Sequence, residues 1–217
     1  MDNKTDLNVW ELRRSYTKSG LLEADLPENP FKLLKRWIEQ ALISKVPEPN
    51  AMSLATVKKD QVPDVRMILL KEIEEDTILF FTNYRSEKAE DLKHCPAAAC
   101  CFWWAELERQ VRLRGSVEKV ARGESTAYFA SRPRESQLGA WASDQSREVQ
   151  GREALELKFE DFKKKYEGKE IPVPAEWGGY RIRVTDLEFW QGRPGRLHDR
   201  ILFCRTSSGW SRKRLAP

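Results

Sequence analysis

The chain has 217 residues, of which 40% are hydrophobic and 33% are charged, and its formal net charge is +4. A chain of this length and composition is typical of one globular domain with a sizeable core, which excludes a disordered or fibrous protein. The small net charge gives no reason to expect a nucleic-acid partner, and no apolar run approaches the roughly 18 residues that a membrane span needs.

The N-terminal segment, residues 1–28, is expected to form an arm that precedes the main domain, residues 29–217. The arm contains one short helical stretch around residues 9–16 and a break at Gly20. It has no apolar stretch of the kind that marks a secretory signal, so we expect a soluble, cytoplasmic protein without a membrane partner.

The main domain begins with a helix, because Asn29 suits an N-cap and Pro30 suits the first helical position. Apolar residues at helical spacing carry this helix to about Lys45. Short apolar runs with turn-like breaks between them then predict strands. In chain order the expected elements are strands over 51–57, 64–71 and 77–82, a helix over 86–94, strands over 97–104 and 109–120, helices over 122–131, 134–142 and 151–167, and strands over 179–192, 198–205 and 210–216.

This order of elements predicts a mainly β fold. Hairpins connect neighbouring strands, and no alternation of strand and helix supports a parallel sheet. The strands are numerous enough to close into an antiparallel β-barrel with flanking helices.

The signatures of several common enzyme classes are missing from the sequence. It has no P-loop, no GxGxxG turn, no GxSxG elbow and no HExxH pair. The four cysteines lack the paired spacing of zinc ligands, so buried, inert thiols are favoured over a metal site built from His94, Cys95 and Cys100. No metal is expected.

Cations flank two predicted elements. Arg66 and Lys71 bracket four apolar residues of one strand, an arrangement that can hold a phosphate at its rim and a flat ring against its middle. Ser86 and Lys88 begin a helix, whose free N–H groups can bind an anion. On pattern alone, ordinary surface charges are favoured for the first pair and a plain N-cap for the second.

Two further groups of residues are candidates for a site. Tyr128, Arg132 and Ser136 are spaced four and four around a proline, so they can converge on one phosphate or simply end a helix.

In the run RLHDR, an extended chain places Arg196, His198 and Arg200 on one side. Burying such a row costs several kcal/mol, of the order of ~2–7 per unpaired polar group, unless partners satisfy it. A functional site is therefore favoured here, with Trp190 as an aromatic edge for a flat cofactor.

The motifs RMILLK, FFTN, ERQVRLRG, YFASRPRESQLGAW, SDQS, WGGYR, EFWQG, RLHDR and RLAP follow one another over nearly the whole chain. In this combination the chain resembles the pyridoxine (pyridoxamine) 5′-phosphate oxidase family. The resemblance implies an FMN-binding split barrel that works as a homodimer, with FMN at the subunit interface. It also implies oxidation of pyridoxine 5′-phosphate or pyridoxamine 5′-phosphate to pyridoxal 5′-phosphate in vitamin B6 salvage or biosynthesis. O2 accepts the electrons, H2O2 is released, and the amine substrate also gives ammonia.

The resemblance also implies roles for individual residues. FMN contacts fall on Arg66, Met67, Ile68, Leu69, Lys71, Phe81, Thr82, Lys88, Gln110, Gln145, Ser146, Trp190 and Arg200. The substrate phosphate is expected to bind Lys71, Tyr128, Arg132 and Ser136. Arg196 and His198 lie over the substrate ring as catalytic residues, and Arg196 acts electrostatically because arginine is a poor base. Arg13 and Tyr16 match residues that close over the site.

One position departs from the family pattern. The family usually has Ser-Arg-Lys where this chain has Ser86, Glu87 and Lys88, so Glu87 is expected to weaken the grip on the FMN phosphate. Arg85 is the nearest candidate to replace the missing cation. Two rival interpretations are another flavin split-barrel enzyme, such as a flavin reductase, and a non-catalytic β-barrel that binds a small ligand or nucleic acid.

Overall fold

The computed structural model describes residues 15–217 of the chain. The helical stretch expected around residues 9–16 falls almost wholly outside these residues, and so does Arg13. Tyr16 is described and is not helical.

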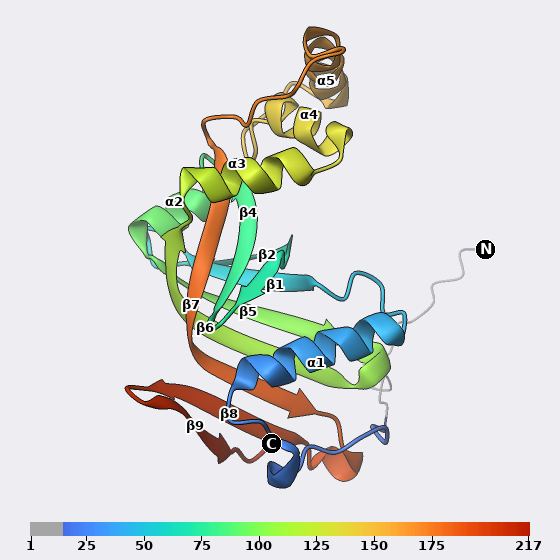
Figure 1. Ribbon diagram of the computed structural model, residues 1–217, viewed down its shortest axis with the longest axis vertical. Helices are drawn as coiled ribbons and strands as arrows, with labels where there is room; N and C mark the ends of the chain where they lie inside the picture. Colours follow the sequence, from blue (N-terminus) through green and yellow to red (C-terminus); the bar gives the residue numbers. More distant parts are fainter. Residues whose placement is uncertain (1–14) are drawn as a thin grey trace, which may run out of the picture.

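The described residues form a nine-stranded antiparallel sheet whose order is β2-β1-β5-β6-β7-β4-β3, with β8 and β9 added beside β7 (Figure 1). The strands are β1 (Ala51–Val57), β2 (Pro63–Leu69), β3 (Glu72–Glu74), β4 (Thr77–Asn83), β5 (Ala97–Trp104), β6 (Arg109–Lys119), β7 (Trp177–Gln191), β8 (Asp199–Thr206) and β9 (Gly209–Arg214).

The sheet divides along the long strand β7. Its first half pairs with β4 and its second half pairs with β8, while β6 runs along its other edge. A change of register at Arg114 and Gly115 bends β6 at this division. Gly115 is required there because a Cβ atom would lie 2.0 Å from the carbonyl oxygen of Arg183. The two branches make the barrel a split one.

The helices lie in two groups, one against the side of the sheet and one at an end of it, where the last two helices extend away from the strands (Figure 1). They are α1 (Pro30–Ile43), α2 (Glu87–His94), α3 (Arg122–Ser131), α4 (Arg134–Ala142) and α5 (Arg152–Lys165), with short 3-10 turns η2 (Glu23–Asp25), η3 (Ala105–Leu107) and η4 (Pro194–Arg196). Helix α1 is capped by Asn29, whose Oδ1 accepts from the Phe31 N–H at 2.8 Å. Its Trp37 ring packs on Phe189 with centroids 5.1 Å apart, so α1 closes one side of the core.

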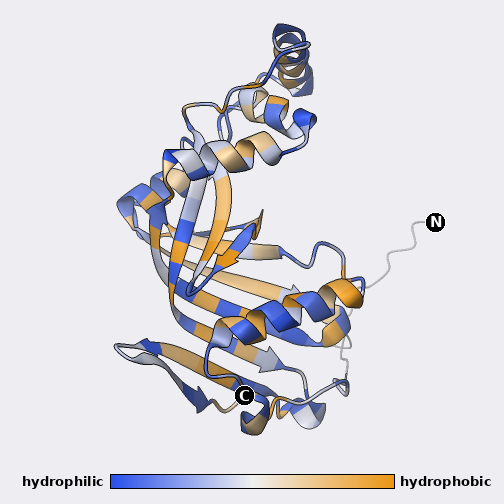
Figure 2. Cartoon of the chain, viewed as in Figure 1, coloured by the Kyte–Doolittle hydropathy of each residue, from blue (hydrophilic) through white to orange (hydrophobic). Residues whose placement is uncertain are grey.

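Two hydrophobic clusters hold these layers together. The larger fills the barrel beneath α1, and the smaller joins α3, α4 and the end of α5 to the start of β7 through Phe129, Leu138, Tyr166, Ile171 and Trp177. Helix α5 itself has no buried residue and is mostly hydrophilic (Figure 2). The smaller cluster therefore fixes α3 and α4 at the end of the molecule opposite β8 and β9 (Figure 1).

The expected fold class, an antiparallel barrel with flanking helices, is confirmed, and every expected strand and helix of the main domain is present with small differences at its ends. The three-residue strand β3 was not predicted. The prediction of an extended RLHDR run is wrong, because Gly195 and Arg196 adopt left-handed conformations with φ of 65° and 61° in the turn η4. Strand β8 begins only at Asp199. No helix in the described part of the chain is long and apolar enough to cross a membrane.

Candidate functional site

A cavity of about 1010 Å³ lies between β2, β4, the start of α2 and the α3–α4 corner. Residues predicted from five separate motifs line it together. They are Arg66, Met67, Ile68, Leu69, Lys71, Phe81, Thr82, Lys88, Tyr128, Arg132, Ser136, Gln145 and Ser146. The fold thus brings both the predicted phosphate clamp of the substrate and most of the predicted FMN contacts to one place.

Arg66 is already engaged within the protein. Its guanidinium donates to Asp64 at 2.5 Å, to the Thr56 hydroxyl at 2.7 Å and to the Leu54 carbonyl at 3.1 Å. The Asp91 carboxylate lies 3.7 Å away. Arg66 is therefore held at the cavity wall in one orientation, with part of its charge neutralised.

Lys88 is the cation of the cavity that lies deepest, with only 8% of its surface exposed. Its Nζ donates to Gln145 Oε1 at 3.3 Å and to the Thr82 hydroxyl at 3.4 Å, and that hydroxyl donates to the same Gln145 oxygen at 2.8 Å. Desolvation lowers the pKa of Lys88, and the nearby Arg66 charge lowers it further. An anion in the cavity would reverse this shift by supplying opposite charge.

The start of α2 shows whether Arg85 can replace the cation that is missing at Glu87. Glu87 and Lys88 both line the cavity, whereas Arg85 does not. The Arg85 guanidinium instead bonds Glu176 at 3.1 Å. The Ser86 hydroxyl donates to the Asn83 carbonyl at 2.7 Å and makes no side-chain cap on the helix. Arg85 is therefore not in place to substitute for the missing cation.

Aromatic rings form the wall next to Arg132. Phe81 stacks on Tyr128 with centroids 4.1 Å apart and on Trp177 at 5.4 Å. The Arg132 guanidinium carbon lies 4.8 Å from the centre of the Trp177 ring. Trp177 was not assigned to the site from sequence, although it begins the WGGYR motif.

The guanidinium of Arg132 is also incompletely satisfied. Its Nη1 is buried and has no hydrogen-bond partner among the described residues. Desolvation lowers its pKa, although Tyr128 opposes the change. Such a donor is costly to leave unpaired, by ~1–3 kcal/mol or more. An anion of the right size would satisfy it, and Ser136, in the first turn of α4, lines the same wall.

The other predicted residues do not line this cavity. Gln110, Trp190 and Arg200 instead form one row, because each is the direct strand partner of the next across β6, β7 and β8. Trp103 on β5 is paired with Gln110 and extends the row. It is 49% exposed, and its ring centroid lies 5.9 Å from that of Trp190. Strand alternation in β5 was the signal that could have included Trp103.

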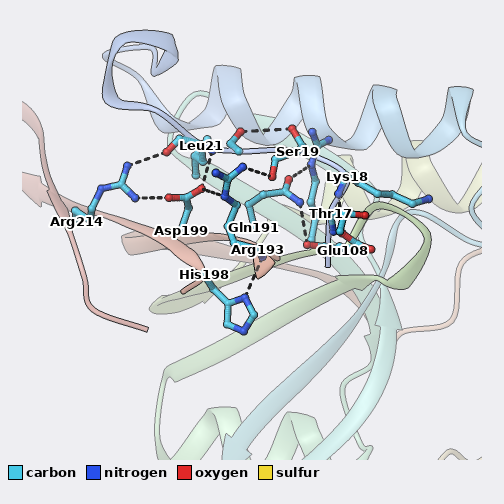
Figure 3. A network of polar contacts seen from close by, with 12 residues as sticks. Thr17, Lys18, Ser19, Leu21, Glu108, Gln191, Arg193, His198, Asp199 and Arg214 are labelled. Atoms are coloured by element: carbon cyan, nitrogen blue, oxygen red, sulfur yellow. Dashed lines mark hydrogen bonds and ion pairs between the residues drawn. The ribbon is translucent and has the colours of Figure 1, made fainter. Parts of the chain in front are cut away.

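His198 stands over the end of this row. Its ring lies 4.6 Å from Trp190 and 5.7 Å from Tyr16, measured between centroids. The backbone N–H of Arg193 donates to Nδ1 at 3.1 Å (Figure 3), so this nitrogen is unprotonated and neutral His198 carries its proton on Nε2. Desolvation and then the charge of Arg196 hold the pKa of His198 below its ordinary value of 6.5.

Arg196 and Arg200 differ in their surroundings. Arg200 donates to Glu188 at 2.9 Å and to the Ala216 carbonyl at 2.9 Å, and the bond to Glu188 raises its pKa. Arg196 is exposed, has a left-handed backbone and makes no hydrogen bond or ion pair with another described side chain. A strained, unpaired cation of this kind is typical of a functional position.

The outer face of the sheet connects the cavity to the row. One line of paired residues crosses it from Met67 through Ser53, Cys101, Arg112 and Glu188 to Leu202. Ser53 and Cys101 on this line are small, and Arg112 pairs with Glu188 at 3.6 Å, while Val65 and Met67 on the edge strand β2 are 64% and 65% exposed. Exposed apolar residues such as Val65 and Met67 are typical of a protein interface.

A split antiparallel barrel with a cationic, aromatic cavity at its open edge defines the class of protein, the split-barrel proteins. Among solved structures, PhzG from Burkholderia lata 383, in complex with tetrahydrophenazine-1-carboxylic acid, is similar with a TM-score of 0.86 and 29% identity, covering 93% of this chain and 100% of that chain. A pyridoxamine 5′-phosphate oxidase-related, FMN binding protein from Nostoc punctiforme has a TM-score of 0.69 at 18% identity, covering 87% and 98%, and shares the fold.

The chain belongs to the pyridoxamine 5′-phosphate oxidase family. The family profile matches residues 38–166, and the pyridoxine 5′-phosphate oxidase C-terminal dimerisation region matches residues 177–217. A pyridoxine/pyridoxamine 5′-phosphate oxidase from Nostoc punctiforme is 52% identical over 98% of this chain and 100% of its own. One from Cupriavidus taiwanensis is 52% identical over 95% and 98%. The resemblance drawn from the motifs is thereby confirmed, and the chain is an oxidoreductase.

Proposed function

We propose that this protein oxidises pyridoxine 5′-phosphate or pyridoxamine 5′-phosphate to pyridoxal 5′-phosphate, with FMN as cofactor and O2 as electron acceptor. The observation that carries the proposal is the buried, unpaired Nη1 of Arg132 beside a wall of stacked aromatic rings. A phosphate satisfies the donor, and a flat heteroaromatic ring suits the wall.

The residues of the cavity fit two phosphorylated, planar molecules. Lys88 at the start of α2 would hold the FMN phosphate, with Thr82, Gln145 and Ser146 beside it. The strand β2 would lie along the flavin. Lys71, Tyr128, Arg132 and Ser136 would hold the substrate phosphate. FMN supplies the two-electron acceptor when bound, and the protein supplies position and electrostatics.

The site is proposed to be shared between two copies of the chain. The row Gln110, Trp190 and Arg200, together with Arg196 and His198, would complete the cavity of the partner in a homodimer. The exposed outer face of the sheet and the matched dimerisation region support this arrangement. Two-fold symmetry would then make two equivalent sites from two identical surfaces.

The C4′ carbon loses a hydride and the C4′ hydroxyl loses a proton, which leaves the aldehyde. O2 takes up the two electrons and two protons and leaves as H2O2. With the amine, the same two-electron oxidation gives an imine, which water converts to the aldehyde and ammonia. Arg196 would stabilise charge at the substrate ring, and the Nε2–H of His198 would donate a hydrogen bond to it.

Peroxide production with pyridoxine 5′-phosphate against unphosphorylated pyridoxine tests the proposal. We expect kcat/KM for the phosphate ester to be at least about a hundredfold higher, because remote phosphate binding positions the reacting carbon. Equal rates would contradict the phosphate clamp. A yellow protein that oxidises neither compound would favour another flavin split-barrel enzyme. A colourless protein that does not bind added FMN would favour the non-catalytic barrel.

A further inference from the structure

The arm residues Tyr16 to Leu21 lie on the turns that join β5 to β6 and β7 to β8 (Figure 3). The Glu108 carboxylate is the centre of this contact. Its Oε2 accepts from the backbone N–H of Thr17 at 2.9 Å and from that of Lys18 at 3.0 Å. The hydrogen bonds from these two consecutive amides to one carboxylate oxygen are charge-assisted. Such bonds are roughly twice as strong as neutral ones.

Glu108 also belongs to the wall that carries Trp190. Its carbonyl accepts from the Gly192 N–H at 2.8 Å and from the Gln191 side chain at 3.2 Å. Glu108 is 1% exposed and has a left-handed backbone with φ of 55°. One residue therefore ties the arm to the end of β7, and the surrounding bonds fix its conformation.

Gly192 leaves the space that the arm needs. A Cβ atom there would lie 2.7 Å from Cγ of Tyr16 and 3.1 Å from Cβ of Glu108. The Tyr16 ring is thus brought against Trp190, with centroids 5.7 Å apart and planes at 88°, and against His198.

Asp199 holds the other end of the same segment. Its Oδ2 accepts from the Leu21 N–H at 3.0 Å, and its Oδ1 pairs with Arg214 at 2.6 Å. Arg214 in turn bonds Glu23 and the Leu21 carbonyl. The arm is held at two points by its backbone, and Tyr16 lies next to the first of them.

We infer that Glu108 is a positioning residue for the oxidation. By binding the arm backbone it sets Tyr16 as a third wall beside Trp190 and His198, and this wall contacts the flat heteroaromatic ring of the substrate. The inference rests on the proposed function, because it assigns Tyr16 to the substrate side of the site. Glu108 itself touches neither substrate nor cofactor.

The test compares Glu108→Ala and Thr17→Pro with Glu106→Ala in the full-length chain. Thr17→Pro removes one of the two N–H donors from the arm without altering the barrel. Glu106→Ala removes an exposed carboxylate two positions from Glu108 and keeps the backbone carbonyl that accepts from Lys18. The readouts are amide hydrogen exchange of residues 17–21 and the separate values of KM and kcat for pyridoxine 5′-phosphate.

We expect Glu108→Ala and Thr17→Pro to speed exchange in the arm and to raise KM about three- to tenfold, the worth of one aromatic contact, with kcat within about twofold. Glu108→Gln should fall between these variants and wild type, because it keeps a neutral acceptor. Glu106→Ala should match wild type in both exchange rate and KM. In a chain that already carries Tyr16→Ala, Glu108→Ala should not raise KM further.

Faster exchange with unchanged KM in an active enzyme would overturn the inference, and so would additive effects of Glu108→Ala and Tyr16→Ala. A merely structural role would lower the melting temperature without this non-additivity. A wild-type chain that oxidises neither phosphate would instead contradict the proposed function, whatever the exchange rates.

Discussion

In the cavity, Lys71 and Arg132 have no carboxylate within ion-pair distance among the described residues, and Lys88 bonds only neutral oxygens. At the β7–β8 turn the arrangement is the opposite. Arg200 lies 2.9 Å from Glu188, and Asp199 pairs with Arg214 at 2.6 Å and with Arg193 at 3.6 Å.

The difference indicates that the cations of the cavity are available to bind an anion, whereas the cations of the turn stabilise the fold through ion pairs. Lys88 and Arg132, which are buried or half-buried without a carboxylate partner, raise the free energy of the empty cavity, and bound phosphates would lower it. Arg66, which pairs with Asp64, is the exception in the cavity. The paired cations of the turn keep the arm and the C-terminal strands together. Arg196 is the exception in the second region, since it is exposed and makes no ion pair with another described residue.

Arg196→Ala tests that exception and should have the largest effect. Removing one charge-stabilising donor from the reacting centre should lower kcat about 10²- to 10³-fold while FMN stays bound. Peroxide release and flavin absorbance measure the two quantities. Arg205→Ala, a change to an exposed arginine of the same strand region, is the control. Wild-type turnover in Arg196→Ala would remove Arg196 from the mechanism.

Arg132→Ala tests the unpaired cation of the cavity. Loss of charge-assisted bonds to a phosphate should raise KM for pyridoxine 5′-phosphate about ten- to a hundredfold, with little change for unphosphorylated pyridoxine. Arg152→Ala, at an exposed arginine on α5, is the matched control. An equal loss for both substrates would show that Arg132 stabilises the fold and not the phosphate.

Co-expression of Arg132→Ala with Arg196→Ala tests whether the two regions meet across a dimer. If each site takes the cavity from one copy and Arg196 from its partner, a random mixture should recover about a quarter of wild-type activity. The double variant Arg132→Ala/Arg196→Ala co-expressed with wild type is the complementary mixture, and it should keep about a quarter of wild-type activity if the site is shared and about half if it is not. No recovery in the first mixture would place both residues in one subunit's site.

Glu87→Arg places a cation at the position where the family usually has arginine, and it tests the effect of that charge on FMN affinity. Because Arg85 is bonded to Glu176, it does not take the place of the missing cation, and the change should tighten FMN about two- to fivefold, equivalent to ~0.3–1 kcal/mol at a helix N-terminus. Fluorescence titration of apoprotein with FMN measures it. Glu90→Arg, one turn along α2, should have a smaller effect, and equal effects would indicate only a general change of charge.

The pH dependence of His198 should give the smallest change. Its pKa lies below 6.5, so its neutral form predominates at pH 7 and activity should fall only on acidification below that value. The same depressed pKa means that the unfolded chain binds more protons in this window, so stability rises with pH through it. Arg196→Gln should raise the pKa toward 6.5. An NMR titration, with His94→Gln to assign the second histidine, checks the direction.

The family resemblance supplied the individual site residues, whereas the motifs and their periods were sufficient to predict the antiparallel strands and the break at Pro133. These features depend on contacts within one element or between neighbours in sequence, where spacing determines direction. The left-handed conformation of Arg196, in contrast, was not predicted, and it belongs to a turn that begins with Pro194 and Gly195.

Only the tertiary structure decided which of the predicted residues share a cavity and which lie in the row at the other end of the sheet. It also decided that Arg85 turns to Glu176, and that Glu108 accepts from Thr17, which is 91 positions away. The sequence determined which side chains carry charge and aromatic surface, because those are properties of single residues. The partner of each charge depends on which distant segments the fold brings together, and a local sequence pattern carries no information about that pairing.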